Sequence, residues 1–565
     1  MSEVISRIAA CIACTCFFYV GTYKSLGALQ QCGYKNKRFS RWLKRKDNLY
    51  YNRLALWSGL GLLSTAVVSL CFSFAGAVVA QLVSAVPFFL FCLLFCAADR
   101  NYALKVPVKN TGRVKRLSAV YLLLIACVSY IVVALLDFAA AAIKSELYDL
   151  FAFLPYTLMP LLLPWLLCLA NLLDGLYENP RNKKFVRRAG QILDESKIVR
   201  VAVVGSYGKT SVKNILKSIL SAKYSVVETP ESFNTPVGIA KTVTGPDFAG
   251  KQVLIAEMGA RHVGDIAELC GLVKPDYAVF TGVCAQHVET FGSEENILKG
   301  KSEIVKSSAK KIVCGGELKE KIAALPLDVL SMSEKEKCLY ADYATLISDL
   351  KLKPHATSFT LCLPDTDAIA VEVPLLGKHS AENVALAALL AREMGLTGEE
   401  IARGIEGIRP VPHRLQLIEG DGVYILDDSY NANPLSFSRM LEAAAEMAGD
   451  HADRPLVCVL GEMGELGSLS EDEHRNLGRL VADIKPRLVC WKGGHLEEFE
   501  DGLHAGRYGG AFCPVTSAED MFKGLAACDL GSGGGVILFK GSRSNKLETL
   551  VSAFTEAQAG EPHAV

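Results

Sequence analysis

Residues 198–204 read IVRVAVV, and the chain continues directly with Gly205-Ser-Tyr-Gly-Lys-Thr-Ser211. The short β-branched run predicts a strand, and the apolar spacing after the glycines predicts a helix. Glycines between a strand and a helix let backbone N–H groups close around phosphate oxygens, and the helix N-terminus adds partial positive charge. Lys209 supplies a full charge, and the hydroxyl of Thr210 can reach a magnesium ion. This stretch predicts an α/β domain that binds a nucleotide through Gly205, Ser206, Gly208, Lys209, Thr210 and Ser211.

The glycine loop is shorter than the common G-x-x-x-x-G-K phosphate loop, and this departure is informative. Read alone, it could be a chance glycine turn, although the flanking strand and helix argue against that. The G-x-x-G-K-T-S form resembles the loop of the Mur ligases, and further segments follow in that family's order. They are Asn234-Thr-Pro-Val-Gly238 and Ala256-Glu-Met-Gly-Ala260. The second ends a buried-strand pattern with a carboxylate at the carboxyl end, where open α/β sheets bind ligands.

The resemblance implies a magnesium site. It makes Glu257 a magnesium ligand and makes His287, in Ala285–Gly292, a second residue that contacts metal. Lys301 falls where Mur ligases commonly carry a lysine carbamylated by carbon dioxide, which turns a cation into a metal-binding anion. The implied metal set is Thr210, Glu257, His287 and, if carbamylated, Lys301. Without the resemblance, the glutamate is a solvated strand end, the histidine is structural and the lysine is an ordinary solvated one.

Two further segments resemble nucleotide contacts of the family. Gly377-Lys-His-Ser-Ala-Glu-Asn383 is similar to the segment that contacts adenine, through His379 and Asn383. On the pattern alone these two residues are simply i, i+4 neighbours on one helix face. Arg414 resembles the arginine that touches the terminal phosphate, where a guanidinium stabilises charge on the transferring phosphoryl group. Its alternative reading is a surface arginine.

A second α/β domain is predicted after Arg414, because strand patterns alternate with helical ones again. The predicted strands cover 423–427, 456–460, 487–491 and 536–540. Within this part, Asp427-Asp-Ser-Tyr-Asn-Ala-Asn-Pro434 resembles the MurF branch, which adds D-alanyl-D-alanine to the cell-wall peptide. The resemblance adds Asp428 and Asn431 to the nucleotide-binding residues. Segments 461–467 with His474, and 540–544, are similar to later MurF segments, and a DNPR-like motif of the diaminopimelate-adding branch is absent.

The N-terminal part is strongly apolar and accounts for most of the positive mean hydropathy of +0.26. Five apolar stretches are each about the ~20 residues that a membrane-spanning helix needs. They lie near 4–22, 54–75, 77–97, 118–140 and 150–173. Lysines and arginines crowd the loops at 35–46 and 100–116, which predicts that both loops are cytoplasmic. Five spans with this constraint put the N-terminus outside and everything after Asp174 in the cytoplasm, where ATP is available.

Composition narrows the remaining classes of function. The 565 residues carry 60 basic and 60 acidic side chains, and the soluble part has no basic stripe with interleaved aromatics, so nucleic-acid binding is not supported. The 18 cysteines are scattered, which predicts reduced thiols. Cys11, Cys14 and Cys16 lie close together in an apolar run without further ligands nearby, and we assign no metal there.

The sequence therefore predicts a multi-domain chain: a transmembrane α-helical bundle (1–175), a linker (176–197), a central P-loop α/β domain of Mur ligase type (198–412), a Rossmann-like α/β C-terminal domain (413–556) and a tail (557–565). The expected activity is an ADP-forming, ATP-dependent peptide ligase that works through an acyl phosphate, with ATP and Mg²⁺ as cofactors. The expected location is the cell membrane, with multiple spans and cytoplasmic catalytic domains.

The expected partners are a carboxylate-bearing envelope precursor, an amino acid or dipeptide, the lipid bilayer and other cell-wall enzymes. MurF enzymes have a small soluble N-terminal domain that helps to hold the UDP-sugar end of the substrate, and membrane helices are expected in its place here. The donor could therefore be nucleotide-linked or lipid-linked. Two alternatives remain open: a ligase for another polymer such as poly-glutamate, and an ATP-driven transport or gating protein. The latter predicts charged residues within the spans, and these stretches carry almost none.

Overall fold

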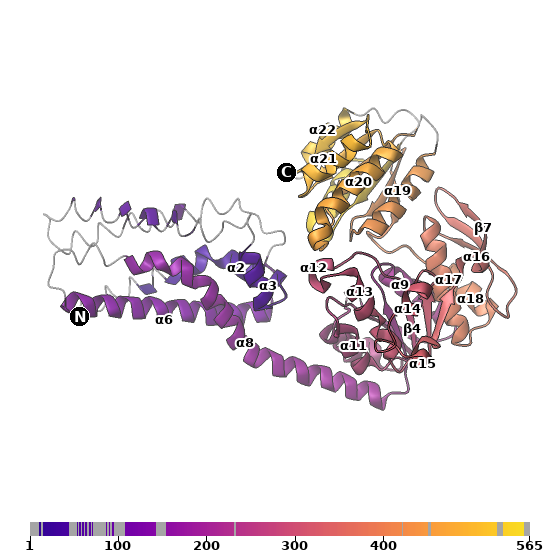
Figure 1. Cartoon of the computed structure of the whole chain (residues 1–565), viewed down its shortest axis with the longest axis horizontal. Coiled ribbons are helices and arrows are strands. Elements are labelled where there is room, and N and C mark those ends of the chain that lie inside the picture. Colours follow the sequence, from indigo (N-terminus) through magenta and orange to yellow (C-terminus); the bar gives the residue numbers. More distant parts are fainter. Residues whose placement is uncertain are drawn as a thin grey trace. The chain divides into compact units, whose positions relative to one another are not determined.

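The computed structural model describes residues 11–12, 15–44, scattered positions between 54 and 94, 108–142, 154–230, 233–420, 422–449, 454–527 and 535–558. The chain divides into two compact units, Met1–Lys183 and Lys184–Val565. Figure 1 shows the helical first unit and the α/β second unit, and each is described by itself.

The described part of the first unit is helical. Its helices pack around an apolar cluster that includes Phe18, Leu29, Leu117 and Leu163. One buried polar contact lies inside this unit, where Thr22 Oγ1 is 2.9 Å from the hydroxyl of Tyr121. The helices are α2 (Tyr23–Gln31), α3 (Asn36–Leu43), α6 (Gly112–Ala142) and α8 (Leu154–Glu195), of which the last continues into the second unit.

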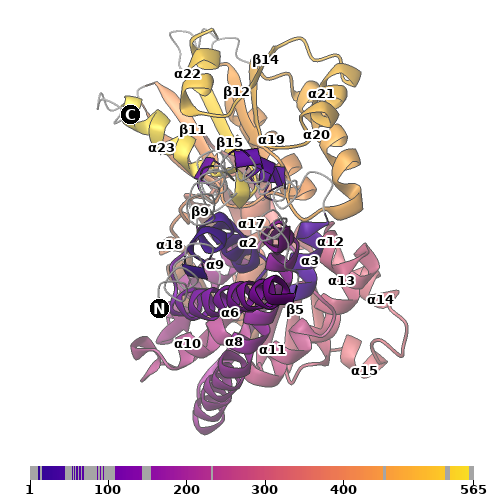
Figure 2. The ribbon, with the colours of Figure 1, turned by 90° about the vertical axis from the view of Figure 1, so that its left-hand side faces the viewer.

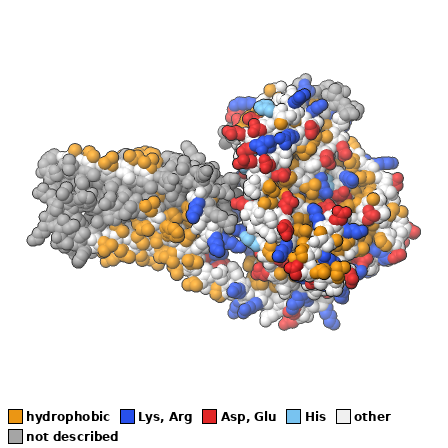
Figure 3. Space-filling model, in the orientation of Figure 1, with side chains coloured by type: hydrophobic (Ala, Val, Ile, Leu, Met, Phe, Trp, Pro, Cys, Tyr) orange, Lys and Arg blue, Asp and Glu red, His pale blue; other side chains and the backbone are white. Residues whose placement is uncertain are grey.

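Two of these helices are long and apolar enough to cross a membrane, within Gly112–Val132 and Leu161–Glu195. They carry the predicted stretches 118–140 and most of 150–173. The stretches 4–22, 54–75 and 77–97 lie wholly or partly outside the described residues, so a five-helix bundle stays a prediction. Large apolar side chains of these helices are exposed, among them Leu123 at 63% and Trp165 at 72%. Figure 3 shows such side chains gathered on the described N-terminal helices, whereas charged side chains are interspersed with apolar and other ones on the visible face of the second unit.

Most of the predicted linker, 176–197, is helical because α8 runs on to Glu195. Its last turns carry apolar residues at helical spacing, and this face packs against the core of the second unit. Those residues are Phe185, Val186, Ala189, Ile192 and Leu193.

The middle domain is built on a six-stranded parallel sheet in the order β2-β3-β1-β4-β5-β6. The strand predicted from IVRVAVV is β1, in the middle of the sheet, which explains why its last four residues, Val201–Val204, are apolar and buried. The strands are β1 (Val199–Val204), β2 (Val226–Glu228), β3 (Val253–Glu257), β4 (Tyr277–Phe280), β5 (Lys311–Gly315) and β6 (Cys338–Ala341).

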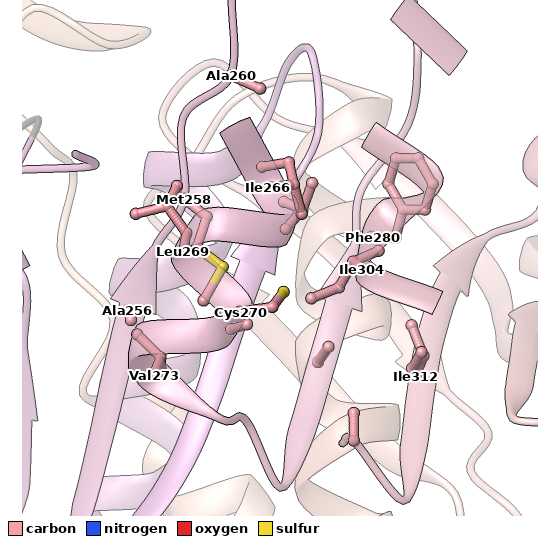
Figure 4. Packing of buried hydrophobic residues seen from close by; sticks show 14 of the residues in the cluster. Ala256, Met258, Ala260, Ile266, Leu269, Cys270, Val273, Phe280, Ile304 and Ile312 are labelled. Carbon is pink, nitrogen blue, oxygen red and sulfur yellow. The ribbon is translucent and has the colours of Figure 1, made fainter. Parts of the chain in front are cut away.

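Apolar layers cover both faces of this sheet. One face packs against the end of α8, α10, α11 and neighbouring turns, and Figure 4 shows Ile266, Leu269 and Val273 of α11 in that layer. The other face packs against α9, α17 and α18. The helices of this domain are α9 (Lys209–Ser221), α10 (Pro236–Val243), η2 (Pro246–Phe248), α11 (Asp265–Val273), α12 (Val288–Phe291), α13 (Glu294–Lys301), η3 (Ser302–Lys306), α14 (Leu318–Ala323), α15 (Met332–Lys335), α16 (Tyr343–Leu346), α17 (Lys378–Glu393) and α18 (Gly398–Glu406).

A small antiparallel sheet, which the sequence did not predict, extends the second layer. Its strands are β7 (Ile347–Leu352), β8 (Thr357–Leu361) and β9 (Ile369–Val373). Phe359, Leu361 and Val373 turn inward against α17, which buries one face of the sheet.

The C-terminal domain has a six-stranded sheet in the order β10-β11-β15-β12-β13-β14, in which only β10 runs antiparallel to its neighbour. All four predicted strands are present, as β11 to β13 and β15. Helices cover both faces of the sheet, α19 to α21 on one and α22 with α23 on the other (Figure 2). The strands are β10 (Gln416–Glu419), β11 (Val423–Asp428), β12 (Leu456–Gly461), β13 (Leu488–Lys492), β14 (Ala511–Pro514) and β15 (Gly535–Lys540). The helices are α19 (Pro434–Ala448), η4 (Gly467–Leu469), α20 (Ser470–Ile484), α21 (Leu496–Ala505), α22 (Ala518–Ala526), η5 (Arg543–Asn545) and α23 (Glu548–Gln558).

The Asn-rich segment before Pro434 has a clear local role. Asn433 caps α19, because its side-chain oxygen accepts a hydrogen bond from Ser436 N at 2.8 Å, and Pro434 occupies the first helical position.

Candidate active site

The predicted phosphate loop joins the carboxyl end of β1 to α9. Gly208 adopts a left-handed conformation, with φ 70°, just before the helix starts at Lys209. A Cβ at Gly205 would lie 1.9 Å from Thr281 Oγ1, so only glycine fits there. Ser206 N donates to Gly282 O at 2.8 Å, and Ser211 lies in the first turn of α9. The loop therefore presents its backbone and the N-terminus of α9 at one edge of the sheet.

Two lysines converge on one carbonyl of this loop. Lys209 Nζ donates to Gly205 O at 2.8 Å, and Lys301 Nζ donates to the same oxygen at 3.0 Å. Burial lowers the pKa of Lys209, and the charge of Arg414 acts in the same direction although Glu257 opposes it. Lys301 is only 1% exposed, and burial with the nearby charge of Lys209 lowers its pKa to about 7. Lys301 is therefore not an ordinary solvated lysine.

Glu257 ends β3 directly beside β1, and its carboxylate is held on several sides. Thr210 Oγ1 donates to Glu257 Oε2 at 2.8 Å, and Asn234 Nδ2 lies 3.3 Å from Oε1. Lys213 Nζ is 3.6 Å from Oε2 and also donates to Thr229 O at 2.6 Å. The carboxylate is 2% exposed, which excludes a solvated strand end.

The pairing of Thr210 and Glu257 fits a magnesium ion. A hydroxyl and a carboxylate at the mouth of the phosphate loop are the oxygen donors that Mg²⁺ prefers, and Mg²⁺ completes its shell with waters and phosphates. Among the described residues, no group of three His, Cys, Asp or Glu side chains could hold a metal ion by itself.

His287 comes directly before α12 and faces the C-terminal domain. Its Nδ1 contacts Oε2 of Glu465, whose other oxygen lies 3.0 Å from Arg261 NH2. Burial lowers the pKa of His287, the contact with Glu465 opposes this, and the charges of Lys301 and Lys209 add to the lowering. His287 is thus within electrostatic reach of both loop lysines.

Arg414 lies at the start of the C-terminal domain, with its guanidinium 4.2 Å from the ring centre of Tyr430. Arg543 lies against the same ring at 4.9 Å. The effect of Arg414 on the pKa of Lys209 places its charge near the phosphate loop, where the sequence predicted it.

The two residues predicted to contact adenine occupy different surroundings. A Cβ at Gly208 would come within 3.2 Å of Asn383 Oδ1, so Asn383 lies against the phosphate loop. His379 is surrounded differently: burial, together with the charges of Arg439 and Lys540, lowers its pKa to about 3.

Asp428 and Asn431 gather around one buried lysine of the C-terminal domain. Lys540 Nζ forms an ion pair with Asp428 and donates to Asn431 O at 3.3 Å. Lys540 is fully buried, so these two residues serve at least to compensate its charge.

The structure thus brings together Lys209, Thr210, Glu257, Lys301 and Asn383, with His287 and Arg414 close by. Several contributors were missed at the sequence level: Lys213, Thr281, Arg439 and Glu465. Lys213 had a signal, because it lies one helical turn after Lys209 and on the same face. The others come from distant segments that only the fold brings near.

Comparison with known proteins agrees with this geometry. Residues 203–391 match the profile of the Mur ligase middle domain, and residues 413–543 match that of the Mur ligase glutamate ligase domain. The chain is 30% identical to the UDP-N-acetylmuramoyl-tripeptide–D-alanyl-D-alanine ligase of Bacillus subtilis over 376 residues, which cover 63% of this chain and 76% of the relative.

Solved structures show the same relationship. MurF of Thermotoga maritima in complex with ADP superimposes with a TM-score of 0.58 at 26% identity, covering 67% of this chain and 84% of that one. MurF of Acinetobacter baumannii gives 0.58 at 25% identity, covering 66% and 80%. The chain therefore belongs to the Mur ligase family, as a MurF-like, ATP-dependent ligase.

Proposed function

We propose that this ligase joins D-alanyl-D-alanine, or a similar dipeptide, to the terminal carboxylate of a muramoyl peptide during peptidoglycan precursor synthesis. The substrates are those in the names of its relatives. The observation that carries the proposal is the contact between Thr210 and Glu257 at the mouth of a loop that holds Lys209.

The residues of the site suit a two-step reaction. A substrate carboxylate oxygen attacks the terminal phosphorus of ATP, and ADP leaves, which gives an acyl phosphate. The amine nitrogen then attacks the acyl carbon, the amide forms, and phosphate and a proton leave. Lys209 and Arg414 would stabilise charge on the transferring phosphoryl group, which needs positioning and neutralisation more than covalent help.

Magnesium fits this scheme through the chain's own oxygen donors. Thr210 and Glu257 would hold Mg²⁺, with His287 and a carbamylated Lys301 as further contacts, and the ion would neutralise phosphate charge. Lys213 would keep the carboxylate of Glu257 in place, because its buried ammonium lies beside it.

We further propose that the enzyme works at the membrane surface, with α6 and the apolar first part of α8, up to about residue 173, in the bilayer and the ligase domains in the cytoplasm. Exposed leucines along both helices support a lipid-facing surface. A polar contact supports the orientation: Arg113 Nε lies 3.1 Å from Asp174 Oδ2, and Arg116 also pairs with Asp174. The basic loop and the end of the last apolar stretch therefore meet, as a shared cytoplasmic side requires.

The test uses the full-length chain purified in detergent. ATP, Mg²⁺ and D-alanyl-D-alanine are supplied with UDP-linked muramoyl tripeptide, its undecaprenyl-linked form, or poly-glutamate in separate reactions. We expect ADP release only when a muramoyl peptide and the dipeptide are both present, and a new amide product in the mass spectrum. ADP release in the absence of a muramoyl peptide or of the dipeptide, or only with poly-glutamate, would refute the proposal.

A further inference from the structure

Glu465 extends from the C-terminal domain to the middle domain and makes three contacts there. Its Oε1 lies 3.0 Å from Arg261 NH2, and its Oε2 contacts His287 Nδ1. Its backbone oxygen accepts a hydrogen bond from Glu289 N at 3.3 Å. One carboxylate oxygen and the main chain of Glu465 thus engage the segment that carries His287, and the other carboxylate oxygen engages Arg261 in the loop after β3.

The backbones on both sides of this contact are unusual. Glu465 and His287 both have φ 65°, a left-handed backbone conformation that residues other than glycine rarely adopt. The approach is also close, because a Cβ at Gly467 would lie 3.0 Å from Glu289 Cα. Such local strain persists where the surrounding structure determines it, and it concentrates at functional sites.

The C-terminal domain fixes the segment that presents Glu465. Met463 N donates to Nε2 of the buried His474 at 2.9 Å, and Gly464 N donates to Ser542 Oγ at 2.7 Å. Asn545 Nδ2 donates to Glu462 O at 2.9 Å. Glu465 is therefore offered by a braced loop and is not a freely moving surface glutamate.

The contact with Glu465 favours one of the two places for the ring proton of His287. An ionised carboxylate only accepts hydrogen bonds, so a neutral imidazole facing it must carry its proton on Nδ1. Nε2 then keeps its lone pair for a ligand. Partners of this kind orient histidines beside metal and phosphate sites, and their loss typically reduces metal affinity or activity ~10–100-fold.

We propose that Glu465 is a positioning residue that fixes the ring of His287 in the active site. The inference rests on the proposed function, since it assigns His287 to that site. It adds a residue of the C-terminal domain to the groups that orient the site in the middle domain.

The experiment compares Glu465→Ala, Glu465→Gln and Arg261→Gln in the full-length enzyme. Arg261→Gln is the matched control, because it removes the other partner of the same carboxylate and leaves His287 untouched. Selective ¹⁵N-histidine labelling reports which ring nitrogen is protonated, and a His287→Gln spectrum assigns the signal among the 10 histidines. kcat and KM are measured on the same samples.

Wild type should show His287 protonated on Nδ1. Glu465→Ala should lose that signature and reduce kcat by about 10-fold or more, with a smaller change in the KM for ATP. Glu465→Gln should recover part of the loss, because its amide oxygen can still accept from Nδ1, and Arg261→Gln should stay near wild type.

Two results would overturn the inference. One is an unchanged His287 spectrum in Glu465→Ala. The other is an equal loss of kcat in Arg261→Gln and Glu465→Ala, because Glu465 would then act only as a partner in an ion pair between the domains. If wild type joined no muramoyl peptide at all, the proposed function would fail, whereas the spectrum would still report on the contact.

Discussion

Lys301 offers the sharpest test of the site, because its burial prepares it to react with carbon dioxide. Its ammonium is 1% exposed and its pKa is lowered to about 7 from the ordinary 10.5. At pH 7.5 about three quarters of the amine would be neutral, against about one part in a thousand for an ordinary lysine. Only the neutral amine attacks carbon dioxide; it then loses a proton and becomes a carbamate anion.

We therefore expect a carbamate on Lys301 that activity requires. Enzyme equilibrated with ¹³C-bicarbonate at pH 7.5 should show a carbamate carbon signal that is missing in Lys301→Met. Removing carbon dioxide should lower kcat by about 10-fold or more, and bicarbonate should restore it. Below pH 7 the amine protonates, so the signal and the activity should fall together as the pH drops from 8 to 6.

Lys213 provides the matched control. It is equally buried at 1% exposure, but its ammonium is already engaged, because Nζ donates to Thr229 O at 2.6 Å and lies 3.6 Å from the carboxylate of Glu257. Lys213→Met should keep the carbon signal. A wild-type spectrum without a carbamate signal, or a signal that survives in Lys301→Met, would refute the reasoning.

Three other predictions follow from named contacts. Lys209→Gln should lower kcat by about 100-fold or more, because the charge at the phosphate loop is lost. Lys217→Gln, on the exposed side of the same helix, should leave kcat unchanged. A folded Lys209→Gln enzyme with full ATP turnover would contradict the assignment of the phosphate loop. Gly404→Ala should lower the free energy of unfolding by about 1–3 kcal/mol, because the new Cβ would lie 2.5 Å from Ile219 Cα. Gly271→Ala, in a helix with open space around the new Cβ, should raise it by ~0.5–1 kcal/mol. Urea unfolding of both variants measures the difference. Burial lowers the pKa of His474, so the neutral form stabilises the folded chain; this stabilisation is complete above about pH 6.5 and is lost as the pH falls below it. The free energy of unfolding should therefore fall with pH more steeply in wild type than in His474→Asn, by up to about 1.4 kcal/mol per pH unit. Parallel curves for the two proteins would contradict this prediction.

The sheet strands and the phosphate loop could be predicted because their signals are local. β1, β11, β12 and β15 are largely buried strands inside their sheets, so each reads as a short, mainly apolar run with glycine or a charged residue at or just after its end. The small β7-β8-β9 sheet was missed because its strands are short and only one face is buried. Its pattern is weak, and packing against α17 decides it.

The partners within the site could not be predicted, because they join distant segments. Nothing near His287 in the sequence indicates that it contacts Glu465. Nothing near Gly205 indicates that Thr281 packs against it. A cluster of motifs in family order places residues on the same edge of a sheet, but register and docking decide which atoms meet. This explains why the candidate residues were found while the groups that orient them were not.

The charge distribution of the site explains why it suits a nucleotide. Lys209 and Arg414 place two cations near the phosphate loop, and Lys301 shares a backbone carbonyl with Lys209, while among the described residues the carboxylate that acts on Lys209 is that of Glu257. Burial lowers the pKa of both lysines, so the protein alone favours the charged forms less than water does. A triphosphate would restore that balance by supplying the missing negative charge in a site that excludes water.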